Sequence, residues 1–157
     1  MIKSNELRIG NWVNFSYTYK KEVITRPCSV AILDRDFLLV NDKGDYLSLY
    51  YETDSIQPIP LSGELLVKCG FKYGTTEGIT SFEYDDNDPE GTTHYWDKPI
   101  IATELVDSHN ISIVKWGEQE YFTFQLERGF YRQKIKYLHQ LQNLYFALTS
   151  EELIINF

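Results

Sequence analysis

Residues 37–51 read FLLVNDKGDYLSLYY, two apolar runs joined by a short polar segment. Phe37–Val40 and Tyr46–Tyr51 have the length of strands, and Asn41–Asp45 has the composition of a hairpin turn. Gly44 stands where such a turn needs a positive φ, which glycine adopts at no steric cost. The pattern therefore predicts an antiparallel hairpin at this point of the chain.

The same pattern of short apolar runs extends through the N-terminal part of the chain. It predicts further strands over residues 7–15, 23–33 and 56–59. Pro27 breaks the second of these, and Pro58 restricts the last, because proline cannot donate to a central ladder. Short strands joined by tight turns indicate a small curled sheet, so we expect an SH3-like β-barrel, with a simple meander as the alternative.

Residues 62–70 interrupt the strands with a predicted short helix, which Ser62 caps and Gly70 ends. Beyond it, apolar runs predict strands over residues 71–73, 81–84, 100–106, 111–116 and 121–126, with a polar loop over 85–93. A helix is predicted over 133–147, because apolar residues recur there at intervals of three and four. On its wetter face we place His139, Gln140, Gln142 and Asn143.

Together these elements predict an α+β fold, in which an antiparallel C-terminal sheet is packed by one amphipathic helix. We expect a β-barrel-like subdomain over residues 1–60 and an α+β subdomain over 61–157, or one continuous domain of both.

The composition describes a globular acidic protein of 157 residues, 43% hydrophobic, with a net charge of −8. No apolar run approaches the length that crosses a bilayer, and residues 1–8 lack the apolar core of a secretory signal, so we expect a cytoplasmic protein. The net charge argues against non-specific nucleic-acid binding. Cys28 and Cys69 lack the spacing of a metal or redox motif, and we expect two reduced, buried thiols.

Three stretches, Glu6–Val13, Ile56–Phe71 and Tyr137–Thr149, together form a recognisable signature. The chain resembles a family of small uncharacterised proteins of Bacteroidota genomes, their phages and other mobile elements. The resemblance carries no known activity, cofactor or catalytic residue. It implies an accessory protein, which would act in the host cytoplasm if it is phage-encoded.

A calcium loop is the sharpest metal motif, with candidate ligands Asp86, Asp88, Glu90 and Asp97 around Gly91. It departs from the usual pattern, because position 5 is Glu, position 12 is Asp and no helices flank it, so an acidic solvated turn is the simpler interpretation. The histidines, His94, His109 and His139, lack the spacing of a helical metal pair.

No nucleophile elbow, phosphate-binding loop or dinucleotide motif occurs, so we predict no enzyme and no cofactor. A basic and aromatic cluster is the candidate nucleic-acid site of the alternative hypothesis. Its members are Arg128, Tyr131, Arg132, Lys134, Lys136 and Tyr137. A solvated helix entry would give the same pattern.

Aromatic residues are abundant, with twelve tyrosines, nine phenylalanines and three tryptophans. Because tyrosine and tryptophan favour interfaces, some of those expected in loops or at strand ends are candidate contacts for another protein or a second copy. They are Tyr17, Tyr19, Tyr50, Tyr51, Tyr95 and Trp96. The preference of strands for aromatics explains them equally well. The leading hypothesis is a non-catalytic interaction protein, and a nucleic-acid accessory protein or a small-ligand-binding protein or enzyme are the alternatives.

Overall fold

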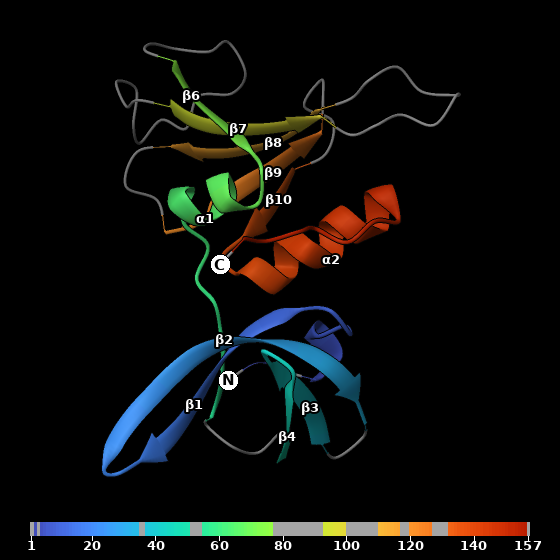
Figure 1. Ribbon diagram of the computed structural model, residues 1–157. Helices are drawn as coiled ribbons and strands as arrows, with labels where there is room; N and C mark the ends of the chain where they lie inside the picture. Colours follow the sequence, from blue (N-terminus) through green and yellow to red (C-terminus); the bar gives the residue numbers. More distant parts are fainter. Residues whose placement is uncertain are drawn as a thin grey trace. The chain divides into compact units, whose positions relative to one another are not determined.

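The structure is a computed structural model that describes residues 2, 4–34, 37–50, 55–76, 93–99, 110–116, 120–126 and 132–156. These residues form two five-stranded antiparallel sheets, two α-helices and one short 3₁₀-helix (Figure 1). They divide into two compact units, residues 1–60 with 137–153, and residues 61–136 with 154–157. No helix within the described ranges is long and apolar enough to span a membrane.

Unit 1 contains the N-terminal sheet and the longer helix. Its strands are β1 (Trp12–Tyr19), β2 (Glu22–Leu33), β3 (Phe37–Asp42), β4 (Asp45–Tyr50) and β5 (Ile56–Pro58), with the 3₁₀-helix η1 (Ser4–Glu6) before them and α2 (Leu138–Thr149) after. The strand order is β4-β3-β2-β1-β5. Among the described strands no pairing joins the edge strands β4 and β5, so the structure shows an open antiparallel sheet.

One face of this sheet forms the core of unit 1, and alternate residues of its strands are buried there. The cluster includes Val13, Phe15, Cys28, Val30, Leu38, Val40 and Ile56. The predicted hairpin of residues 37–51 is present as β3 and β4, which pair from Phe37↔Tyr50 to Asp42↔Asp45. Gly44 has φ +102° in the turn, and its N–H donates to Asn41 Oδ1 at 2.7 Å. The prediction of a glycine with positive φ is confirmed.

Unit 2 contains α1 (Gly63–Lys68), β6 (Lys72–Thr76), β7 (Thr93–Pro99), β8 (Asn110–Trp116), β9 (Phe122–Leu126) and β10 (Arg132–Ile135). The strands follow one another in the order β10-β9-β8-β7-β6. Ser62 caps α1 as predicted, with its Oγ accepting from Leu65 N at 3.1 Å, and Gly70 follows the helix with φ +82°. The core includes Leu66, Trp96, Ile111, Ile113 and Phe124.

The prediction of one helix over 133–147 is wrong at its start. Residues 132–135 form strand β10, which pairs with β9 from Arg132↔Gln125 to Ile135↔Phe122. Ile135 fits either period, and pairing with β9 decides for the strand. The helix begins at Leu138, where Tyr137 N donates to Gln140 Oε1 at 3.3 Å.

The placement of this helix also differs from the sequence prediction. The boundary near residue 60 coincides with the end of the first stretch of unit 1 at Pro60. The prediction assigned residues 61–157 to one subdomain, whereas α2 belongs to unit 1 and contacts β1. The strands predicted over 81–84 and 100–106 and the loop over 85–93 lie wholly or almost wholly outside the described residues, apart from Thr93 at the start of β7.

Candidate functional site

The distal end of the β1–β2 hairpin, residues 17–24, exposes both apolar and basic side chains; we call it the hairpin tip. Here β1 and β2 pair only with each other among the described strands, in the register Tyr17↔Ile24, Thr18↔Val23 and Tyr19↔Glu22. Tyr19 is 56% exposed and Val23 is 73% exposed. The tip thus offers side chains on a paired backbone that the core does not cover.

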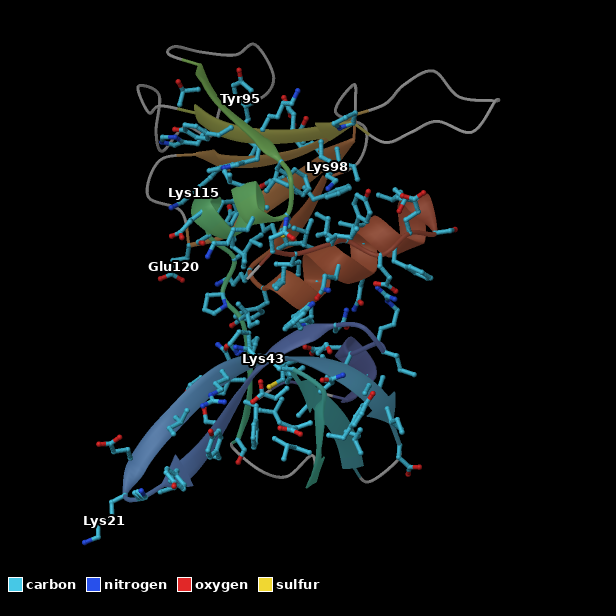
Figure 2. The ribbon with its side chains drawn as sticks, viewed as in Figure 1. Lys21, Lys43, Tyr95, Lys98, Lys115 and Glu120 are labelled. Atoms are coloured by element: carbon cyan, nitrogen blue, oxygen red, sulfur yellow. The ribbon has the colours of Figure 1, made fainter. Side chains whose placement is uncertain are left out.

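The turn of this hairpin consists of Lys20 and Lys21, and both have a left-handed backbone. Their φ angles are 49° and 73°. Two-residue loops that need a positive φ at both positions favour Asn-Gly, because a Cβ in the left-handed region costs about 1 kcal/mol or more. Both lysines are exposed, and Figure 2 shows Lys21 at the far end of the hairpin. The turn therefore holds two charges in a conformation that disfavours their residue type.

Aromatic contacts connect the tip to the core. The ring of Tyr17 stacks on Phe15, with centroids 5.5 Å apart. The guanidinium of Arg26 lies 5.8 Å from the centroid of Tyr17 and pairs with Asp42 at 3.2 Å. Lys20 Nζ lies 5.2 Å from the ring of Tyr19. These contacts give the tip a supported aromatic surface next to its charges.

The structure separates the six aromatic residues that the sequence singled out as interaction candidates. Tyr17 is half-buried and Tyr19 is exposed, and both belong to the tip. Tyr50 ends β4, but its side chain and all of Tyr51 lie outside the described residues. Tyr95, on β7, is half-buried and leaves no room for a side chain at Gly74, where a Cβ would lie 2.3 Å from its ring.

Trp96 is a core residue and not a surface contact. It is 6% exposed and makes an edge-to-face contact with Phe122, with centroids 5.5 Å apart. Tyr73 of β6 lies against it at 5.3 Å and is itself 54% exposed. The expectation that Trp96 lies in a loop or at a strand end is wrong, because the mixed composition of Thr93–Pro99 does not indicate the strand β7 that these residues form.

The described members of the basic and aromatic cluster of residues 128–137 lie on β10 or between β10 and α2. Arg128 and Tyr131 lie outside the described residues, and only the backbone of Arg132 is described. Lys134 Nζ lies 4.4 Å from the ring of Tyr121, and Lys136 pairs with Glu120 at 3.6 Å. Tyr137 caps α2 in unit 1.

These four described positions therefore do not form one helical surface. Lys134 lies on β10, which ends the described sheet of unit 2, and exposed lysines at such a position discourage pairing with another chain.

Of the four candidate calcium ligands, only Asp97 lies within the described residues. Asp97, on β7, accepts a hydrogen bond from Ser112 Oγ at 2.6 Å. Asp86, Asp88 and Glu90 lie outside the described residues. In the part of the chain that the structure describes, no three His, Cys, Asp or Glu side chains gather as a metal site would require.

The two described histidines have different surroundings. His94 is half-buried, and its Nδ1 is 2.8 Å from the hydroxyl of Tyr73. His139, on α2, is buried, and neither of its ring nitrogens has a hydrogen-bond partner among the residues that the structure describes. Burial lowers the pKa of His139, and the carboxylate of Glu6, 3.9 Å away, opposes that shift. His109 lies outside the described residues.

Polar side chains that the sequence placed on the wetter face of α2 bind the N-terminal segment instead. Gln142 is 1% exposed; its Oε1 accepts from Trp12 N at 2.8 Å and its Nε2 donates to the carbonyl of Gly10 at 3.1 Å. Asn143 Oδ1 accepts from the buried Asn11 at 2.9 Å. Since buried polar groups need partners, this network is structural.

An ion pair extends that network to the surface. Arg8 pairs with Glu152 and lies 4.0 Å from the ring centroid of Phe146. The hydrogen bond from Arg8 lowers the pKa of Glu152.

Both thiols are buried and free, as predicted, and burial raises the pKa of Cys28 and of Cys69 to about 11. A thiol with such a pKa is a weak nucleophile at neutral pH.

Comparisons with known proteins assign no role to the hairpin tip. No family model matches the chain, and neither does any curated protein or solved structure. Of the tip residues, the sequence pattern indicates Tyr17 and Tyr19 as contacts but not Lys20, Lys21 or Val23. The signal that points to them is a pair of adjacent lysines between two strands of alternating character.

Proposed function

We propose that this protein is a non-catalytic interaction protein that binds another protein, or a second copy of itself, through the hairpin tip. The observation that carries the proposal is the exposure of Tyr19 and Val23 on a paired hairpin outside the core. Tyrosine contributes a large contact area at a low entropy cost, which favours it at protein interfaces. The backbone pairing adds rigidity, so little order has to be gained on binding.

The fold expectation also finds support in unit 1. Strand β5 follows β4 in the chain but pairs with β1 on the other side of the sheet, from Val13↔Pro58 to Phe15↔Ile56. Because β4 and β5 are consecutive in the chain yet lie at opposite edges of the sheet, their connection favours a curved sheet whose edges approach each other. We therefore retain an SH3-like barrel as the architecture of unit 1. An origin in a phage or mobile element, and a place in the cytoplasm, rest on the sequence and stay predictions.

Nucleic-acid binding through residues 128–137 has weaker support. Lys134 and Lys136 already engage Tyr121 and Glu120, and the whole chain carries −8. A nucleic-acid partner would need many more cations in contact with phosphates.

Site-specific photo-crosslinking tests the proposal. A benzophenone amino acid replaces Tyr19, and the purified protein is irradiated in a lysate of its host cells. The matched control carries the same group at Tyr46 of β4, which is 62% exposed. We expect a discrete adduct from position 19 and none of the same mass from position 46. A dimer-sized adduct would identify a second copy as the partner. The proposal fails if position 19 gives no adduct, or gives only those seen at position 46.

A further inference from the structure

The charge at the hairpin tip is not a requirement of its turn. The β3–β4 turn of the same unit has a similar backbone, with φ 52° at Lys43 and +102° at Gly44, and it places glycine at the second position. The β1–β2 turn has lysine at both positions. An Asn-Gly turn would suit that backbone better. The fold therefore does not account for a lysine at position 21, and binding to a partner would account for it.

The charge of the tip is opposite in sign to the net charge of the whole chain. Lys20, Lys21 and Glu22 give it a net positive charge on a chain whose total is −8. Within the described ranges neither lysine pairs with a carboxylate, whereas Arg8, Arg26, Lys68 and Lys136 each do. These two charges are thus available to a partner.

We infer that the hairpin tip recognises an acidic surface of a partner protein, with Lys20 and Lys21 at the turn meeting its carboxylates. Tyr19 on one face of the hairpin and Val23 on the other supply apolar contacts on either side of the turn. This inference rests on the proposed function and names the chemistry of its partner. The acidic remainder of the chain repels such a partner, so the approach is steered toward the tip.

The observations favour a protein over a nucleic acid. Two lysines contact few phosphates, and Arg26 is already paired with Asp42. Val23, the most exposed apolar side chain of the tip, has no role in binding a phosphate backbone.

The test uses a polyglutamate peptide as the probe and follows the backbone amides of the ¹⁵N-labelled full chain by NMR. At low salt we expect polyglutamate to shift the amides of residues 19–23, and the shifts to disappear at high salt. The double variant Lys20→Asn with Lys21→Gly preserves the turn and removes both charges. It should bind the peptide about tenfold more weakly and have a higher melting temperature than the natural chain. Lys43→Asn, at the corresponding position of the β3–β4 turn, should bind as the natural chain does.

Three results would overturn the inference. Polyglutamate could leave the tip amides unshifted, the double variant could bind as well as the natural chain, or a short DNA duplex could shift the tip amides more strongly than the peptide. In each case an adduct from position 19 would still support the proposed function, so the two failures can be told apart.

Discussion

Gly63→Ala adds a single methyl group, yet it should destabilise unit 2. Gly63 begins α1, and a Cβ built there would lie 2.6 Å from Trp96 Cζ2 and 3.3 Å from Cε2. Side-chain carbons do not approach one another that closely, so either the helix or the indole must move by almost 1 Å. Trp96 cannot easily yield, because it is 6% exposed and packs against Phe122 and Tyr73.

The expected cost is the difference of two terms. Forcing one methyl group into a packed site costs about 1–3 kcal/mol. Alanine is intrinsically a better helix residue than glycine, by about 1 kcal/mol in a helix interior and by less at its first turn. We therefore expect Gly63→Ala to lower the free energy of unfolding by about 1–2 kcal/mol.

Urea denaturation followed by far-UV circular dichroism measures this change. Glu64→Ala is the control, because Glu64 is in the same helix and its side chain is 83% exposed; its effect should stay within about 0.5 kcal/mol. In a Trp96→Phe background, Gly63→Ala should lower the free energy of unfolding clearly less, because phenylalanine lacks the indole atoms that the new methyl group would contact. The reasoning is refuted if Gly63→Ala is as stable as the natural chain, or if its cost is the same in both backgrounds.

Three further predictions concern unit 1 and the thiols. Because burial lowers the pKa of His139 below the ordinary 6.5, the unfolded chain gains a proton first as pH falls. Stability should therefore decline below about pH 6.5, and His139→Phe should flatten that decline in denaturation curves taken from pH 7.5 to 5. Arg8→Ala should raise the pKa of Glu152 toward its usual value, which an NMR titration of the side-chain carboxyl reports; an unchanged pKa would contradict the ion pair between Arg8 and Glu152. Cys28 and Cys69 should resist a thiol reagent at pH 8 until urea unfolds the chain, and fast labelling of the folded protein would show that they are accessible.

The parts of the fold that could be predicted from sequence are those set by local chemistry. The turn at Asn41–Asp45 and the cap at Ser62 depend on residues within a few positions of one another. Strand β10 could not be predicted in the same way, because Ile135 suits a helix stripe as well as a strand and only pairing with β9 decides. Gln142 looked solvated because glutamine on a helix normally is, and its partner Trp12 lies 130 residues away.

The candidate site was partly visible for the same reason. Their aromatic character near the end of a strand makes Tyr17 and Tyr19 candidate contacts, and Tyr19 is exposed. The same reasoning makes Trp96 a candidate contact, but Trp96 is buried. Its side chain is covered by α1 and β9, which its neighbours in the chain do not reveal. The lysines of the turn became notable only when their backbone angles were known.

The division of unit 1 between two distant stretches of chain has a consequence for its biosynthesis. When the ribosome has released β1, the glutamine that receives the N–H of Trp12 is still 130 residues from being made. The whole of residues 61–136 must emerge before α2 can dock. During that interval Asn11 and the backbone of Gly10 and Trp12 lack the partners that bury them. We therefore expect the nascent sheet of unit 1 to be a client of chaperones, and the inserted unit 2 to complete its own local pairings first.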